Sequence, residues 1–347
     1  MKTSEIKEKL KLCTRCGRCL SVCPTYEIFL SEMYSPRGRI FLISQNKFHP
    51  SLKDCLFCER CEKVCPHNIS FPEIYIENFI EKKEPVYSEK IFKKFIKNPF
   101  FTFIQINKWF HIINLSAEEI DINKFSENGD ILIFYSCGLK YLYPKALLYF
   151  IDFLKKKNIS VGIPKNQDCC GAVFLSMGLK EALKEKALNI LKVFESSSGP
   201  IVVFCATCLW MLKKIYPLIF RNTPYEEKFI NLSKRVISAF TFLVSNWGNE
   251  VKFNTKNVLF HMPCHLTEEE KMFKNKLNIS KTIKNFCCGS IKISLWIKGF
   301  QEKYKKTWIK ETENKYKLAT FCTGCYLNFK LLLKEPPKVC HWIEVLC

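Results

Sequence analysis

Four short apolar runs stand out along the chain, and each leads into a cysteine. They span residues 131–137, 201–205, 258–264 and 318–322. Apolar runs of this length are typical of strands buried in a parallel sheet. We therefore predict two pairs of buried strands, with a cysteine at the end of each strand.

Longer stretches with apolar residues at helical spacing lie between these runs. Residues 143–157 end in lysines, which suit the negative end of a helix dipole, and residues 179–195 are followed by Gly199 and Pro200. Residues 296–310 form the matching stretch in the second half. This alternation of strand and helix predicts parallel α/β units.

The N-terminal part of the chain has a different pattern, with two near copies of a cysteine block. The fold class that we predict is α+β overall, with a mainly α-helical, two-cluster ferredoxin-like domain followed by two α/β Cys-Cys-Gly repeat domains. The expected boundaries are 1–85 for the ferredoxin-type domain, 86–128 for a helical linker, and 129–250 and 251–347 for the two Cys-Cys-Gly domains. Internal duplication accounts economically for both pairs of repeats.

The cysteine content needs a chemical explanation, since the chain has 20 cysteines among 347 residues. Disulfide scaffolds are mostly small secreted domains. Residues 1–12 carry charges throughout and lack the apolar segment of a secretory signal. We therefore expect a cytoplasmic protein whose reduced thiols bind metal.

The chain is strongly basic, because Lys plus Arg exceed Asp plus Glu by 21. Such a charge suits nucleic acid or an anionic membrane surface. The lysines are scattered, however, and thiolate-ligated clusters carry negative charge that the formal count ignores. We find no nucleic-acid-binding motif and expect no nucleic-acid partner.

No apolar run reaches the ~18 residues that suggest a membrane-spanning helix. The nearest is 99–115, which is rich in Phe, Ile and Trp but interrupted by polar residues. We interpret it as a linker helix packed on the next domain. The alternative is that this stretch, with the basic residues at 93–97, contacts a partner or a membrane surface. The protein would then lie peripherally on the cytoplasmic face of the inner membrane.

The strongest chemical signal is a cysteine spacing that occurs twice. Residues 13–24 and 55–66 both read C-x2-C-x2-C-x3-C-P, the spacing of bacterial ferredoxins. Three cysteines at these gaps can wrap one [4Fe–4S] cubane, and the fourth ligates the other cluster. The predicted ligands are Cys13, Cys16, Cys19 and Cys65 for cluster 1, and Cys55, Cys58, Cys61 and Cys23 for cluster 2. Zinc sites usually combine two separated pairs of ligands, which this spacing does not match.

The segment Ser35-Pro36-Arg37-Gly38-Arg39-Ile40 lies between these blocks. One interpretation is a turn that starts a helix. The other is a basic patch that tunes a cluster or contacts a partner. We favour the structural role.

A second cysteine pattern occurs once in each α/β unit. The first copy is Cys137, Cys169, Cys170, Cys205 and Cys208, and the second is Cys264, Cys287, Cys288, Cys322 and Cys325. The five thiols of a copy should converge at the carboxyl ends of strands, where open α/β sheets place ligands. We predict a third metal cluster in the first copy and a fourth in the second. Vicinal disulfides or buried apolar cysteines are the alternative.

The second copy departs from the first in one interval. The gap between Cys264 and its Cys-Cys pair is nine residues shorter than the corresponding gap after Cys137. One helix must be clipped or replaced by a loop there. The site can still close, because loop length costs little free energy.

Other candidate residues carry weaker signals. His261 and His265 flank Cys264 and are candidate hydrogen-bond donors to sulfur, whereas His341 reads as structural. His67, Cys340 and Cys347 have no assigned role. The chain has no dinucleotide-binding glycine fingerprint, no P-loop and no Ser-His-Asp order, so we expect no flavin or NAD on it and no catalytic residues.

Taken together, these blocks resemble the iron–sulfur subunit of glycolate oxidase over nearly the whole chain. The resemblance rests on residues 13–26, 36–40, 169–172, 263–266, 287–290 and 341–346. The Cys-Cys-Gly repeats are shared more widely. They also resemble those of the B and D subunit types of heterodisulfide reductase, and of the membrane-linked subunit of anaerobic glycerol-3-phosphate dehydrogenase.

This resemblance implies an oxidoreductase complex. An FAD-containing partner would oxidise glycolate or a similar 2-hydroxy acid, and this chain would carry the electrons toward the quinone pool or another membrane acceptor. The heterodisulfide reductases imply an alternative, a catalytic subunit that reduces a disulfide at noncubane clusters held by the Cys-Cys-Gly cysteines. A non-catalytic redox or structural module is the third hypothesis.

Overall fold

The structure is a computed structural model. It describes residues 8–47, 49–81, 120–266, 269, 272, 275, 283–284, 287–288, 300–313, 317–333 and 338–346. Most of the predicted linker, the stretch 99–115, most of the shortened interval after Cys264, and Cys347 lie outside these ranges.

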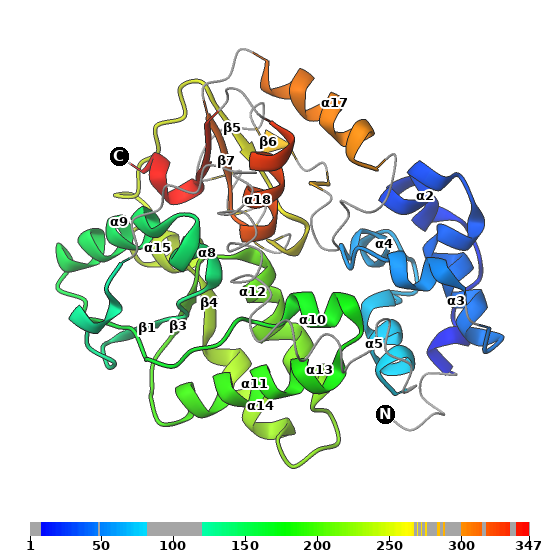
Figure 1. The fold of residues 1–347 in the computed structure, drawn as a ribbon, viewed down its shortest axis with the longest axis horizontal. Coiled ribbons are helices and arrows are strands. Elements are labelled where there is room, and N and C mark those ends of the chain that lie inside the picture. The colour runs from blue at the N-terminus through cyan, green and yellow to red at the C-terminus, as the bar shows by residue number, and fades with distance from the viewer. Residues whose placement is uncertain are drawn as a thin grey trace, which may run out of the picture.

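The N-terminal part is built from short helices, as the sequence predicts, and lies at the right of Figure 1 in blue and cyan. Its elements are η1 (Arg18–Val22), α2 (Pro24–Phe29), η2 (Glu32–Tyr34), α3 (Pro36–Ser44), η3 (Pro50–Asp54), α4 (Arg60–Lys63) and α5 (Phe71–Glu81). Proline opens α2, α3 and η3, where its missing N–H costs no hydrogen bond. The cysteines lie in the connections between these helices or at their ends, where short spacing lets thiols turn toward one another.

Two parallel four-stranded sheets follow. The first contains β1 (Ile131–Ile133), β2 (Val161–Gly162), β3 (Ile201–Val203) and β4 (Val236–Ser238) in the order β2-β1-β3-β4. The second contains β5 (Val258–His261), β6 (Ile283–Lys284), β7 (Lys317–Thr320) and β8 (Lys338–His341) in the order β6-β5-β7-β8. The matching orders support the internal duplication.

The strands are shorter than the apolar runs suggest. β1 ends at Ile133, and Cys137 already opens helix α8. β5 ends at His261, and Cys264 opens the turn η6. Each cysteine therefore follows its strand instead of ending it. Strands β2, β4, β6 and β8 were not predicted, because none of them lies in a continuous apolar run that ends near a predicted ligand cysteine.

Helices surround both sheets. In the first unit they are α8 (Cys137–Tyr141), α9 (Pro144–Lys155), α10 (Ala172–Met177), α11 (Lys180–Glu195), α12 (Ala206–Trp210), the π-helical turn η5 (Met211–Ile215), α13 (Tyr216–Ile219), α14 (Glu226–Arg235) and α15 (Ala239–Trp247), preceded by η4 (Ile122–Lys124). In the second they are η6 (Cys264–Leu266), α17 (Phe300–Thr312), α18 (Thr323–Leu332) and η8 (Trp342–Val345). The stretches predicted as helical correspond to α9, α11 and α17.

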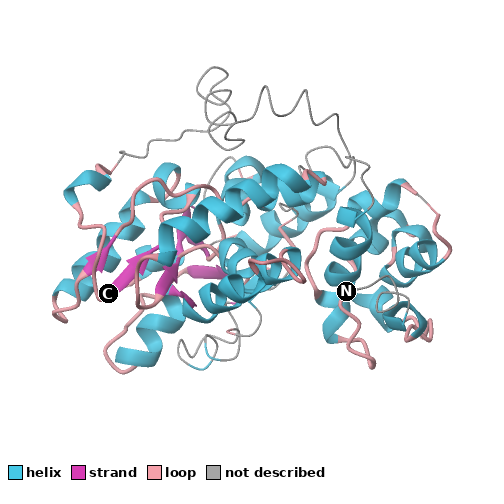
Figure 2. Cartoon of the chain, turned by 90° about the horizontal axis from the view of Figure 1, so that it is seen from below, coloured by secondary structure: helices cyan, strands magenta, loops and turns pink. Residues whose placement is uncertain are grey.

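The two α/β units meet through their cysteine-bearing turns. The Ala206 N–H donates to the Phe321 carbonyl oxygen at 2.8 Å, and the hydroxyls of Tyr143 and Thr323 lie 2.6 Å apart. The Tyr143 ring also stacks on His341, with centroids 4.4 Å apart. Figure 2 shows the strands at one end of the molecule and the N-terminal helices at the other. Within the described residues, no helix has the length and apolar character needed to cross a membrane.

Candidate iron–sulfur centres

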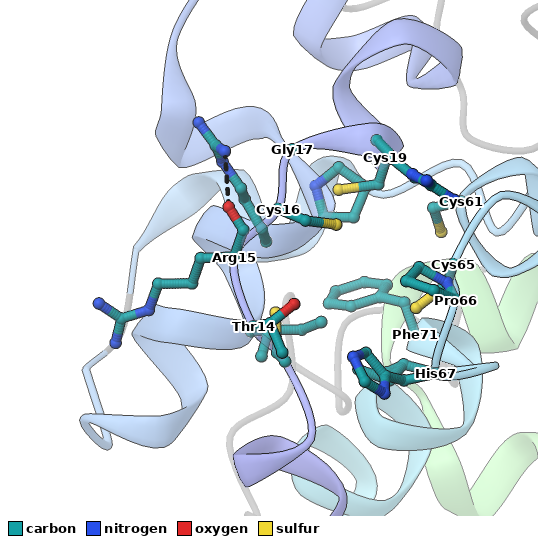
Figure 3. A pocket seen from close by; sticks show the side chains of 16 residues that line it. Thr14, Arg15, Cys16, Gly17, Cys19, Cys61, Cys65, Pro66, His67 and Phe71 are labelled. Carbon is teal, nitrogen blue, oxygen red and sulfur yellow. Dashed lines mark hydrogen bonds between the residues drawn. The ribbon is translucent and has the colours of Figure 1, made fainter.

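The first ferredoxin-type cavity lies between the first cysteine loop and the end of the second. Cys13, Cys16, Cys19 and Cys65 all line it, and Cys61 reaches it as well. Figure 3 shows the sulfur atoms of Cys16, Cys19 and Cys65 turned toward this space. Cys16 is exposed, so one edge of the cavity reaches the surface.

The second cavity is deeper. Cys23, Cys55, Cys58 and Cys61 line it, with Phe57 and Arg39 among the other wall residues. Cys65 of the second block thus lines the first cavity, Cys23 of the first block lines the second cavity, and Cys61 lines both. Whether these four-thiol sets are the cluster ligands stays a prediction.

The loop around the first cavity depends on two glycines. Gly17 has φ +85°, a left-handed conformation that side chains rarely adopt. A Cβ on Gly38 would collide with the carbonyl oxygen of Glu32. Arg37 spans the gap between these segments, since it donates to the Arg15 carbonyl at 2.9 Å and forms an ion pair with Glu32 at 2.6 Å. Segment 35–40 therefore begins α3 and also braces a cysteine loop.

Arg39 is a buried cation beside the second cavity, with only 1% of its surface exposed. Its Nε donates to the Ser51 carbonyl at 2.8 Å, and its Nη2 donates to the Thr25 hydroxyl at 2.9 Å. Thr25 in turn lies 3.2 Å from the sulfur of Cys23. A positive charge so close to a thiolate-ligated cluster would favour its reduced form, because reduction adds negative charge.

The thiols of the second cavity are poor acids until a metal binds. Burial raises the pKa of Cys58 to about 11 and that of Cys61 well above the usual value for a thiol. A metal ion supplies the positive charge that makes such thiols into thiolate ligands. Among the described residues, no three His, Cys, Asp or Glu side chains form a site for one metal ion. A cubane takes one thiolate on each of four irons, so its ligands stand around a cavity, as these do.

The first Cys-Cys-Gly copy brings its five thiols together. Hydrogen bonds link them in the order Cys137, Cys169, Cys170, Cys208 and Cys205. Donation from its neighbours Cys137 and Cys170 lowers the pKa of Cys169 well below its ordinary value. Gly171 has φ +74° and lets the chain turn directly after the Cys-Cys pair. The donor set is all sulfur, which is the ligand chemistry of an iron–sulfur cluster.

The second copy assembles in a similar way. The sulfur atoms of Cys288 and Cys325 lie 2.8 Å apart, and Cys325 also hydrogen-bonds Cys322. Burial raises the pKa of Cys264 well above its usual value, and nearby thiols raise it further. The first of these is Cys58, which belongs to the second ferredoxin-type cavity. The second copy therefore lies against cluster 2 of the prediction.

Three side chains that the sequence did not single out connect these sites. Trp210 stacks on His265 with centroids 4.3 Å apart, and Thr207 contacts the sulfur of Cys322 at 3.1 Å. Burial would lower the pKa of Arg60, but the negative charge of nearby thiols raises it overall. Those thiols are Cys287, Cys58 and Cys264. No periodicity or motif marks these residues, since their partners are remote in the chain.

His265 and His341 make different hydrogen bonds from those that a sulfur-donating role would require. Both ring nitrogens of His265 are engaged elsewhere, Nε2 with the Phe57 carbonyl at 2.8 Å and Nδ1 with the Thr207 hydroxyl at 3.4 Å. The expectation that His265 donates to cysteine sulfur is therefore wrong. Burial lowers the pKa of His265, so its ring is neutral near pH 7. His341 is buried and donates to the Phe204 carbonyl at 3.0 Å, in keeping with a structural role.

Comparison with known families agrees with this arrangement. Residues 12–69 match the family model of the 4Fe-4S dicluster domain. Residues 131–213 and 258–330 each match the model of the cysteine-rich domain. Strands β1 to β3 and β5 to β7 lie within the two cysteine-rich matches, whereas β4 and β8, the last strand of each sheet, follow them.

Curated proteins with similar sequences include two from Bacillus and one from Methanocaldococcus. "Lactate utilization protein A 2" of Bacillus cereus (strain Q1) is 24% identical over 241 residues, which cover 62% of this chain and 97% of that protein. "Lactate utilization protein A 1" of Bacillus anthracis (strain CDC 684 / NRRL 3495) is 24% identical over 238 residues, with the same coverage of 62% and 97%. An uncharacterized iron–sulfur protein of Methanocaldococcus jannaschii is 26% identical over 294 residues, 82% of this chain and 48% of that protein.

The order of the domains and the relatives lead to one conclusion. An iron–sulfur dicluster domain precedes two copies of a cysteine-rich domain. This chain is an iron–sulfur protein whose domain order is consistent with the glycolate oxidase iron–sulfur subunit family.

Proposed function

We propose that this chain is the electron-transfer subunit of a 2-hydroxy-acid oxidase or dehydrogenase. A separate FAD-containing partner would oxidise the substrate, and this chain would accept the electrons singly and pass them on toward quinone or another membrane acceptor. Glycolate is the substrate that the resemblance suggests, and the names of the Bacillus relatives add lactate.

One observation carries the proposal. The second ferredoxin-type cavity contacts the second Cys-Cys-Gly copy, because His265, which directly follows Cys264, donates to the carbonyl of the cavity residue Phe57 at 2.8 Å. The first cavity reaches the surface at Cys16. The proposed clusters therefore form a series from the exterior to the buried cysteine system. Such a series suits a chain that transfers electrons, because each cluster exchanges one electron with its neighbour.

The chemistry expected of the bound clusters is one-electron transfer. The chain's own residues hold them and exclude water. Leu56 and Phe57 close the second cavity on one side, and both are almost fully buried. Arg39 and Arg60 supply positive charge on either side of the cysteines. Under this proposal the 2-hydroxy acid binds to the flavoprotein, its two electrons pass to this chain one at a time, and its two protons are released from that partner.

A disulfide reductase is the second candidate, and a specific contact favours it. Cys205 of the first copy and Cys322 of the second have sulfur atoms 4.0 Å apart. Two clusters meeting there could deliver two electrons to one disulfide, which with two protons gives two thiols. The protein would then be a catalyst in its own right.

One experiment separates the two candidates. The chain is reconstituted anaerobically with iron and sulfide and mixed with an FAD-containing 2-hydroxy-acid oxidase that co-purifies with it. Addition of glycolate or lactate should bleach the iron–sulfur absorbance only when the flavoprotein is present. Disulfide reduction by the chain with an artificial electron donor and no flavoprotein would contradict electron transfer as its sole role. The Cys340→Ser variant is the control, because Cys340 is a buried cysteine outside both repeats.

A further inference from the structure

An aromatic contact joins the N-terminal helices to both Cys-Cys-Gly copies. Phe57 lies between two cysteines of the second cavity, and its ring centroid is 6.3 Å from that of Trp210 on α12. The Trp210 ring is parallel to His265 within 3°. His265 directly follows Cys264, so three segments remote in sequence meet here. In Figure 1 this region lies where α4 and α5 approach α12 and α13.

Short polar contacts run through this region from Cys55 to Cys322. The Phe57 N–H donates to the sulfur of Cys55 at 3.4 Å. The Nε2–H of His265 donates to the Phe57 carbonyl at 2.8 Å, which leaves Nδ1 as an acceptor. The Thr207 hydroxyl lies 3.4 Å from Nδ1 and 3.1 Å from the sulfur of Cys322. Its single proton can be donated to one of these two acceptors at a time, and the other distance is a van der Waals contact.

The surroundings hold these groups in place. Phe57, Trp210 and His265 are 1%, 5% and 8% exposed, so little water reaches them. The Trp210 N–H donates to Glu59 at 2.8 Å, and Lys214 forms ion pairs with Glu59 at 2.7 Å and with Glu62 at 3.2 Å. A dry site whose polar groups already have partners needs little rearrangement when charge arrives.

We propose that Phe57, His265 and Thr207 form the path by which an electron passes from the second ferredoxin-type site to the junction of the two Cys-Cys-Gly copies. The path starts at Cys55 and ends at Cys322. It rests on the proposed function in one respect, that both sites hold clusters. One electron is lost by the cluster on Cys55 and gained by the cluster on Cys322, and no bond forms or breaks. Covalent and hydrogen-bonded contacts carry an electron more readily than an open gap does.

His265 and Thr207 are positioning residues in this path, and each offers a matched pair of variants. Thr207→Val keeps the shape and removes the hydroxyl, whereas Thr207→Ser keeps the hydroxyl. His265→Phe keeps the ring that stacks on Trp210 and removes both hydrogen bonds, whereas His265→Gln retains a donor and an acceptor. Thr312→Val is the control, because Thr312 is 4% exposed and its hydroxyl donates to Trp308 at 2.7 Å within its own helix α17.

The experiment measures electron transfer inside the full-length reconstituted chain. A photochemical donor reduces the ferredoxin-type clusters, and rapid-freeze electron paramagnetic resonance follows their reoxidation as the second cysteine system is reduced. We expect Thr207→Val and His265→Phe each to slow this step about tenfold, because each removes polar contacts from the path. Thr207→Ser, His265→Gln and Thr312→Val should stay close to the parent rate.

Three results would overturn the path. The first is a parent-like rate in both Thr207→Val and His265→Phe. The second is an equal slowing in the conservative and disruptive members of each pair. The third is a loss of iron in Thr207→Val or His265→Phe, since the residue would then hold the site together instead of carrying charge. No flavoprotein is used, so a chain that passes this test but is not reduced by the flavoprotein would refute only the proposed function.

Discussion

The sulfur atoms of Cys205 and Cys322 lie 4.0 Å apart, although 117 residues separate them in the sequence. Cys205 follows β3 and Cys322 follows β7, the third strand of each sheet in chain order. Each of the two sulfur atoms is also contacted by a residue of the other α/β unit. The Thr323 N–H donates to Cys205 at 3.3 Å, and the Thr207 hydroxyl contacts Cys322 at 3.1 Å. The two copies of the cysteine pattern therefore share a boundary and behave as one structural unit.

A serine at position 322 should disturb both copies for this reason. We expect Cys322→Ser to lower the iron content and to change the spectrum of the first copy as well as the second. Mössbauer spectra of the reconstituted variant test this. Cys340→Ser is the control and should keep all its iron, since Cys340 is buried in β8 and belongs to neither set of five cysteines. A spectral change restricted to the second copy would contradict the coupling.

The second prediction concerns the fourth cysteine of each ferredoxin block, which should ligate the cluster of the other block. If the cavities mark the cluster sites, Cys65→Ala should lose the same cluster as Cys16→Ala, although Cys65 belongs to the other block. Cys23→Ala should in turn match Cys58→Ala. Redox titrations monitored by electron paramagnetic resonance compare the residual signal within each pair. The grouping by cavity is wrong if variants within one sequence block resemble each other instead.

The buried Arg39 gives a third prediction, which concerns stability and potential together. Arg39→Met removes two charge-assisted hydrogen bonds, and each such bond contributes about 1.5–3 kcal/mol. It also removes a positive charge beside the second cavity, so the potential of cluster 2 should fall. Arg39→Lys keeps the charge and should lower stability while changing the potential less. Anaerobic thermal unfolding and potentiometric titration supply the two measurements, and equal potentials in both variants would exclude a role for the charge.

Glu73 gives a prediction on pH. Burial tends to raise its pKa, but hydrogen bonds and ion pairs with Lys9 and Arg221 lower it overall. The Lys9–Glu73 pair measures 2.7 Å and the Arg221–Glu73 pair measures 3.1 Å. They tie α5 to one residue that precedes it in the chain and to one that follows it. A carboxyl whose pKa falls on folding stabilises the fold above its unfolded pKa of about 4.3. That contribution is lost as pH falls through the folded pKa.

Glu73→Gln should therefore reduce stability near pH 7 by about 1 kcal/mol, a value discounted for partial exposure. The difference from the parent should begin to shrink as pH falls below the unfolded pKa of about 4.3, and it should vanish only below the lower folded pKa, where the parent carboxyl is also neutral. Unfolding midpoints measured across this range test the sign. Glu195→Gln serves as the control, because its pair with Lys228 is about half exposed on both sides and should not matter measurably. A difference that grows toward acid would contradict the assignment.

Much of the candidate site follows from local spacing. Cys13, Cys16 and Cys19 can reach one cavity because short loops limit how far neighbouring thiols can lie apart. The helices α9 and α11 follow from a repeat of apolar residues that only a helix places on one face. The early ends of β1 and β5 could not be predicted from the sequence, and neither could the strands β4 and β8. A stretch of three or four residues is too short for its apolar and polar positions to define a strand.

The contacts between remote segments were decided by the tertiary structure. No spacing rule brings Phe57 to His265, or Cys205 to Cys322, because each pair is separated by a whole domain or more. Those contacts arise when the apolar faces of three units pack together and their buried polar groups need partners. The sequence by itself determined which residues carry thiols and which thiols can be close neighbours. Folding determined how the groups connect, since burial and hydrogen-bond pairing are properties of the assembled core.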